Sequence, residues 1–118
     1  MEYKRYDIVQ ADLGSFDEDF VQSGIRPVII IQNNIGNLHS PTTIIMPLST
    51  KTFKNPNQPT HTLIKKSKEN GLLRDSMVLG EQMRVISSSR IIKKIGEITD
   101  KKEKKAIRRV YDASFGDE

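Results

Sequence analysis

The sequence predicts a small, mostly β, antiparallel and partly closed barrel that ends in one α-helix. Two observations carry this prediction. Several short β-rich segments are separated by turn signals, and one amphipathic helical pattern follows them near the C-terminus. At 118 residues the chain is expected to form one domain, residues 1–118, that is large enough to bury a core.

The first strand is expected at residues 7–13, and an acidic loop, residues 14–24, follows it. The second strand, residues 27–32, contains four consecutive β-branched residues, a pattern typical of a strand buried on both faces. Pro27 is expected at the first position of this strand, where a missing N–H costs least. Arg26 therefore lies where a flexible loop enters a rigid sheet.

The later elements are marked mainly by their turns. Asparagines, Gly36 and Pro41 predict a turn over residues 33–41, and a third strand follows at residues 42–48. Two prolines and two asparagines make residues 51–59 a loop. Two more strands, residues 60–65 and 76–79, are separated by a turn at residues 69–71. Residues 91–98 form the last predicted strand, which Gly96 interrupts.

The C-terminal segment is predicted to be helical from Asp100, a good N-cap, to Gly116, a helix-ending residue. Glu103 completes a capping-box pattern with Asp100. A stripe with i, i+3, i+4, i+7 spacing defines the buried face and comprises Ile107, Val110, Tyr111 and Ser114. The opposite face is basic.

Charge is distributed unevenly along the chain. Residues 1–50 contain three basic and six acidic residues, whereas residues 51–118 contain 16 basic and nine acidic residues. The C-terminal half therefore suits a polyanion such as nucleic acid, or else presents a solvated lysine-rich face. The sequence has no cysteine, which excludes disulfides and thiolate sites and suits a reducing cytosol. No apolar run approaches the roughly 18 residues of a membrane span, and the polar N-terminus does not predict a signal peptide.

Arg26 is the first candidate for chemistry. A permanently charged guanidinium held at the junction of a loop and a sheet is suited to binding a phosphate. The alternative is an ordinary exposed arginine at the end of a strand. The acidic run of residues 17–19 lacks the ligand pattern of a calcium loop, so no metal site is predicted. His39 and His61, the only histidines, are both expected at the surface.

Several blocks in a fixed order resemble the MazF/PemK-type toxins, the endoribonuclease half of a bacterial toxin–antitoxin pair. Residues 22–28 resemble the Q-x-G-x-R-P signature of that family, and residues 5–13 resemble its opening strand. The other matching blocks are residues 32–37, 40–42, 59–61 and 75–84. No single block is strong, but the ordered set is specific.

The resemblance implies an SH3-like barrel of the CcdB/PemK kind that forms a homodimer in the bacterial cytoplasm. It implies cleavage of single-stranded RNA, often mRNA, at short sequences without a metal or other cofactor. Attack of the ribose 2′-OH on the adjacent phosphorus would leave a 2′,3′-cyclic phosphate and a 5′-OH. The implied protein partner is an acidic, MazE-like antitoxin.

The resemblance also assigns residues. Arg26 aligns with the catalytic arginine of the family, and Ser49 takes the place of a catalytic threonine, keeping the hydroxyl but losing the β-methyl group that restricts χ1. The family's G-S-E-Q loop is replaced by residues 19–22, so the usual glutamate is missing. Phe20 would stack on a base or pack against the barrel or the partner subunit. The expected RNA contacts are Phe20, Gln22, Thr50, His61, Gln82 and Arg84, although Gln82 and Arg84 suit a dimer edge equally.

Two other functions fit the same fold. Gyrase poisons of the CcdB kind share the barrel and act by binding a protein, but the block around Arg26, together with Ser49, favours RNA cleavage. A catalytically inactive RNA-binding barrel is the third interpretation, because of the serine at position 49 and the missing glutamate.

Overall fold

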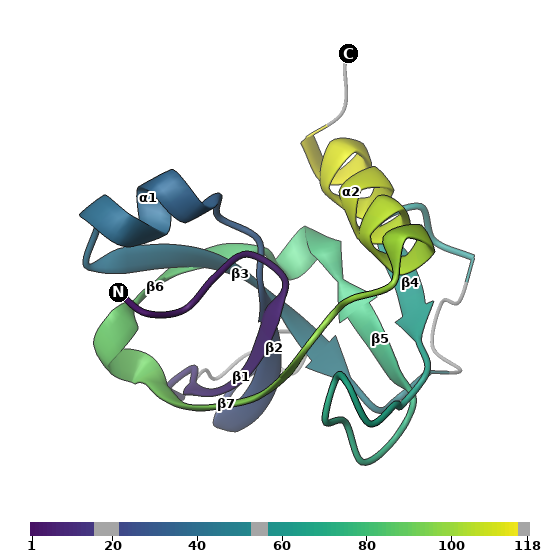
Figure 1. The fold of residues 1–118 in the computed structure, drawn as a ribbon. Coiled ribbons are helices and arrows are strands. Elements are labelled where there is room, and N and C mark those ends of the chain that lie inside the picture. Colours follow the sequence, from purple (N-terminus) through teal and green to yellow (C-terminus); the bar gives the residue numbers. More distant parts are fainter. Residues whose placement is uncertain (16–21, 53–56, 116–118) are drawn as a thin grey trace.

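The computed structural model describes residues 1–15, 22–52 and 57–115, and Figure 1 shows its arrangement. The strands are β1 (Asp7–Asp12), β2 (Ile25–Ile30), β3 (Thr42–Ser49), β4 (His61–Ile64), β5 (Ser76–Leu79), β6 (Arg84–Ser87) and β7 (Ile91–Glu97). The helices are α1 (Asn34–His39) and α2 (Lys101–Phe115), with short 3₁₀ turns η1 (Gly80–Gln82) and η2 (Ser88–Arg90). All strand pairs are antiparallel, in the order β4-β5-β3-β2-β1-β7, with β6 paired to β3. The predicted mostly β, partly closed architecture with a C-terminal helix is confirmed.

Strands β1, β2 and β3 carry two hydrophobic cores, one on each face. Val9, Val28 and Ile45 face a core inside the barrel of β1, β2, β3, β6 and β7. Ile8 and Ile29, with Met46 beside them, face a second core that β4, β5 and α2 cover. The expectation that the second strand is buried on both faces is therefore correct.

Strand β2 begins two residues earlier than predicted. Pro27 is its third residue and pairs with Gln10 of β1, while the ladder between β2 and β3 starts only at Val28. Pro27 thus lies beyond the end of that ladder, where no hydrogen bond to β3 is lost. Arg26 lies within the strand and not in the loop.

Two elements were not predicted. The segment read as a turn contains α1, because the side chain of Asn33 caps the helix by accepting the Gly36 N–H. Buried Asn37 then ties the helix to β3 by accepting the Thr43 hydroxyl at 2.7 Å. Strand β6 was missed because its four residues are too short for a clear alternation.

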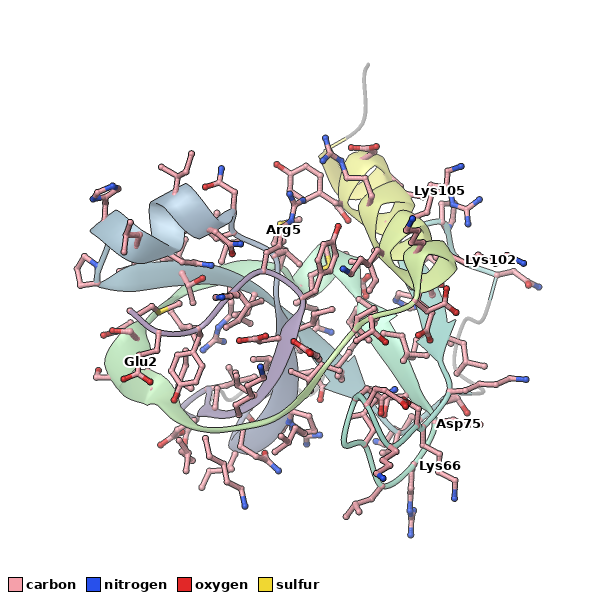
Figure 2. All side chains as sticks on the ribbon, viewed as in Figure 1. Glu2, Arg5, Lys66, Asp75, Lys102 and Lys105 are labelled. Carbon is pink, nitrogen blue, oxygen red and sulfur yellow. The ribbon has the colours of Figure 1, made fainter. Side chains whose placement is uncertain are left out.

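Helix α2 confirms the predicted helix, its N-cap and two of the predicted buried positions. Asp100 accepts the Lys102 N–H at 2.8 Å as an N-cap, and Ile107 and Val110 are buried where the helix packs on β4 and η1. The basic side chains lie on the exposed face, and Figure 2 shows Lys102 and Lys105 pointing away from the body. Among the described residues, no helix is both long enough and apolar enough to cross a membrane.

Candidate active site

Arg26 lies at the open end of the barrel core. Its neighbour on β1 is Ala11, and it shares a face of β2 with Val28, so its stem borders the inner core. Nε donates to the Ser23 carbonyl at 2.6 Å. This bond uses one of the five N–H donors and sets the plane of the guanidinium, which leaves the fork of terminal nitrogens to bind an anion.

Ser49 ends β3 and is 7% exposed. The β2–β3 register pairs Val28 with Pro47. The ladder ends at that pair, and Ser49 pairs with Met77 of β5. By alternation Ser49 lies on the face of β3 that carries Pro47, and Arg26 lies on the face of β2 that carries Val28, so the two side chains share a face. The Ser49 hydroxyl oxygen accepts the Lys51 N–H at 3.2 Å, so its own proton remains available for donation.

Thr50 lies on the other side of the sheet, as alternation requires. It is exposed and, with Pro27, lines a cavity of about 480 Å³. Arg26 and Ser49 therefore lie on one face of the sheet. Pro27 and Thr50, the residues that follow them, lie on the other face.

Gln82 and Arg84 hold the two ends of the β1–β2 loop. Gln82 Oε1 accepts the Gln22 N–H at 2.8 Å, and Arg84 Nη2 donates to the Leu13 carbonyl at 2.6 Å. Burial, with the charge of Arg90 second, lowers the pKa of Arg84 below its ordinary value. Both side chains thus support the loop that leads to Arg26. Contact of Gln82 and Arg84 with RNA remains a prediction.

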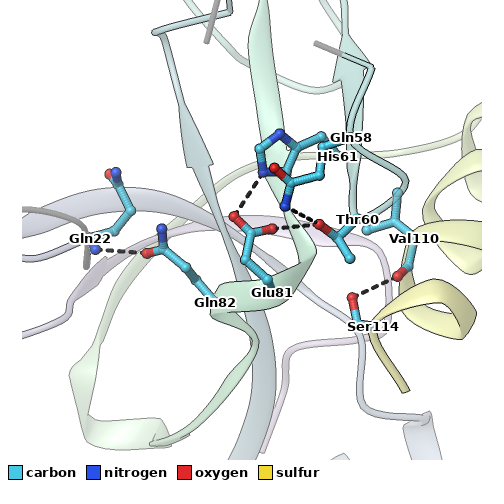
Figure 3. Close-up of polar contacts among 8 residues, drawn as sticks. All are labelled: Gln22, Gln58, Thr60, His61, Glu81, Gln82, Val110 and Ser114. Atoms are coloured by element: carbon cyan, nitrogen blue, oxygen red, sulfur yellow. Dashed lines mark hydrogen bonds and ion pairs between the residues drawn. The ribbon is translucent and has the colours of Figure 1, made fainter. Parts of the chain in front are cut away.

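His61 is not the surface residue that the sequence suggested, because its side chain is only 5% exposed. Its Nε2 donates to Glu81 Oε1 at 2.8 Å, and the Thr60 hydroxyl donates to Glu81 Oε2 at 2.9 Å (Figure 3). Glu81 lies in η1, directly before Gln82, so these bonds fix the turn that carries the loop anchor. Sequence reasoning did not assign Glu81, whose partners lie about 20 positions away.

His39 is exposed, as predicted. Phe20 and the acidic run of residues 17–19 lie outside the described residues. Within the parts of the chain that are described, no three His, Cys, Asp or Glu side chains are grouped to hold a metal ion.

Comparison with solved structures identifies the fold of the chain. By fold it is a barrel of the kind seen in solved toxin endoribonucleases. A mycobacterial endoribonuclease in complex with its cognate antitoxin superposes with a TM-score of 0.76 at 19% identity, covering 96% of this chain and 94% of that one. MazF from Deinococcus radiodurans superposes with a TM-score of 0.75 at 14% identity, with 96% of each chain covered.

Sequence comparison gives the family. The model of PemK-like, MazF-like toxins of type II toxin–antitoxin systems matches residues 4–113. Endoribonuclease MazF of Staphylococcus saprophyticus is 40% identical over 113 residues, which are 96% of this chain and 91% of that protein. Endoribonuclease EndoA of Bacillus subtilis is 41% identical over 97 residues, 82% of this chain and 81% of that protein. The chain belongs to the PemK-like, MazF-like toxin family.

Proposed function

We propose that the chain is the toxin of a toxin–antitoxin pair and that it cuts single-stranded RNA, mRNA included, at short sequences. The observation that carries this proposal is the placement of Arg26 and Ser49. A guanidinium held by Ser23 and a hydroxyl with a spare proton lie on the same face of β2 and β3, near the point where the ladder between these strands ends. These groups suit a phosphodiester whose charge grows during reaction.

The proposed reaction needs no covalent bond to the enzyme and no cofactor. The ribose 2′-oxygen attacks the adjacent phosphorus, the bond from phosphorus to O5′ breaks, and a 2′,3′-cyclic phosphate and a 5′-OH result. The 2′-OH proton passes to water, and O5′ takes up a proton as it leaves. Arg26 binds the phosphoryl oxygens and stabilises their charge, and Ser49 donates a hydrogen bond to one of them.

A mixed RNA pool, incubated with the protein and followed by end-group analysis, tests this function. We expect 2′,3′-cyclic phosphate and 5′-OH ends at a small set of sequences, in the presence of excess EDTA. RNA that is bound but left intact would indicate the inactive barrel. RNA that is neither bound nor cut would favour a gyrase poison of the CcdB kind, for which gyrase binding is the direct assay.

The partner we propose is an acidic antitoxin, acting with the toxin in the bacterial cytoplasm, where the toxin forms a homodimer. A surface that binds RNA phosphates is complementary to an acidic peptide, whose binding loses ordering entropy but gains charge pairing. RNA and antitoxin should then compete for the face around Arg26. Antitoxin affinity that is unchanged by saturating non-cleavable RNA would contradict a shared site.

Substitution of Ser49 tests the hydroxyl directly. Ser49→Ala should lower kcat about a hundredfold, since a positioned proton donor is lost. Ser49→Thr should keep or improve activity, because the β-methyl group restricts χ1. Thr50→Ala is the neighbouring comparison and should act on KM, because Thr50 faces the other side. If Thr50→Ala lowered kcat and Ser49→Ala did not, the alignment of Ser49 with the family threonine would be wrong by one residue.

Gln82 offers a test between support of the loop and RNA contact. Gln82→Ala removes the acceptor of the Gln22 N–H, a bond worth about 1 kcal/mol. If Gln82 holds the loop that orients Arg26, kcat should fall roughly fivefold, as about 1 kcal/mol implies. A rise in KM with kcat unchanged would instead assign Gln82 to RNA binding. Steady-state kinetics on one short RNA distinguishes the two roles.

A further inference from the structure

The cavity of about 480 Å³ that Thr50 lines opens on the face of β2 that lies opposite to Arg26. One side of it is the sheet face formed by neighbouring strands β2, β1 and β7, where Pro27 pairs with Gln10 and Gln10 pairs with Lys93. Thr50, directly after β3, and residues 71–74 and 76 form the rest of its lining. Part of its wall is apolar and comprises Pro27, Leu72 and Ile95. Such a wall suits a flat, largely apolar group such as a nucleobase.

The charged residues that line the cavity are all basic. Arg74 and Lys93 line it and are exposed, whereas none of the residues that line it is acidic. Asp75, the residue after Arg74, accepts the Lys66 N–H at 2.8 Å, which ties the two arms of this hairpin together; Figure 2 labels both residues. The cavity therefore pairs an apolar wall with two cations, which is complementary to an anionic group on the same ligand.

One polar atom in this wall lacks a partner. Gln10 lines the cavity, and its Oε1 is buried without a hydrogen bond from any described residue. A buried acceptor without a donor is uncommon and costs about 1–3 kcal/mol. Protein atoms cover this oxygen, so a ligand N–H reaches it only when the Gln10 side chain turns toward the cavity; the amino and imino groups of nucleobases are such donors.

The cavity lies on the other face of the sheet from the candidate active site, but residues adjacent in the chain connect the two. Pro27 follows Arg26 and Thr50 follows Ser49, so each strand end presents one residue to the phosphate site and the next to the cavity. Consecutive Cα atoms are about 3.8 Å apart. An RNA strand with its phosphate at Arg26 that bends over these ends reaches the cavity with its adjoining nucleotide.

We propose that the cavity binds the nucleotide next to the scissile phosphate. The base packs on Pro27, Leu72 and Ile95, and its N–H group donates to Gln10 once that side chain has turned toward the cavity. The flanking phosphate binds Arg74 and Lys93. This inference rests on RNA being the substrate of the proposed function. The closeness to Arg26 and Ser49 favours a nucleotide over the other anionic ligand, an acidic protein segment.

Kinetics on paired substrates tests the proposal. Arg74→Gln should raise KM for a short RNA about tenfold and reduce the salt slope of log K by about 0.7, the value for one phosphate on a single strand. Lys68→Gln, an exposed charge on the same hairpin that does not line the cavity, is the matched control and should stay within about twofold. Two shortened RNAs keep both nucleotides of the scissile bond but lack the next phosphate on the 5′ side or on the 3′ side. Arg74→Gln should have no further effect on one of the two. Equal behaviour of the two variants on the full RNA overturns the proposal and leaves RNA cleavage standing.

A binding experiment separates this proposal from the cleavage activity. The unmodified protein is titrated with each of the four nucleoside 5′-monophosphates and followed by NMR. We expect shifts at the Leu72 and Ile95 methyl groups and at the Gln10 side-chain amide, differing between bases, with α2 unchanged. This result would stand even if no RNA were cut. Shifts caused by a Glu- and Leu-containing peptide and not by nucleotides would overturn the proposal in favour of a protein-binding surface.

Discussion

Arg26→Ala is expected to lower RNA cleavage about a thousandfold while leaving the fold intact. The loss reflects removal of the donor that stabilises charge on the phosphoryl oxygens, where one preorganised donor is worth a factor of about 10²–10³. The fold should survive because Arg26 is only half-buried and its single described hydrogen bond goes to a loop carbonyl. Initial rates on a short RNA and a thermal melt measure the two quantities.

Arg26→Lys refines this test, because lysine keeps the charge but loses the planar fork. We expect it to recover little activity, since an ammonium group cannot bind two phosphoryl oxygens in the geometry that Ser23 now sets. Arg109→Ala, an exposed arginine on α2, serves as the control for a change in net charge. Near-normal cleavage by Arg26→Ala would remove Arg26 from the active site.

Gly71→Ala is expected to have the largest effect on stability, about 3–5 kcal/mol in the free energy of unfolding. Gly71 has a φ of +68°, and a Cβ atom there would overlap the Ile95 carbonyl oxygen of β7. Strain accounts for about 1–2 kcal/mol of the loss, and displacement of the hairpin from β7 accounts for the rest. Urea unfolding measures the change.

Gly24→Ala is the matched control for this prediction. Gly24 has a similar φ of +75°, but nothing lies within 4 Å of its Cβ position. It should therefore show the strain alone, about 1–2 kcal/mol. If the two substitutions cost the same, the hairpin that carries Leu72 and Arg74 does not pack against β7, and the proposed nucleotide cavity has no outer wall.

The parts of the fold that could be predicted from the sequence are those with a repeated local signal. The β-branched run through Ile31 predicts a strand buried on both faces, and the stripe of α2 predicts a helix with its cap at Asp100. Helix α1 lacked such a signal, because asparagine and glycine mark turns and helix caps alike. Its formation depends on Asn37, which bonds to residues on both sides of the helix.

The residues of the candidate site likewise fall into some that the sequence identified and others that it did not. Arg26 and Ser49 were identified by their resemblance to family residues, and alternation along β2 and β3 places both side chains on one face. The supports of the site were hidden, because the Gln22–Gln82 bond spans 60 positions and no local pattern encodes it. The hydrogen bond of His61 likewise goes to Glu81, which lies 20 positions away.

The two-faced packing of β1, β2 and β3 has a consequence for how such a chain varies in length. Ile8 and Ile29 face one core and Val9 and Val28 face the other, so one inserted residue in a strand exchanges the contents of both. The inserted strand has no solvated side on which the mismatch could be relieved. Insertions and deletions are therefore confined to the connections. The bond from the Leu13 N–H to the Gly24 carbonyl closes the base of the β1–β2 connection. A change in the length of this connection can therefore alter the active site without disturbing the barrel.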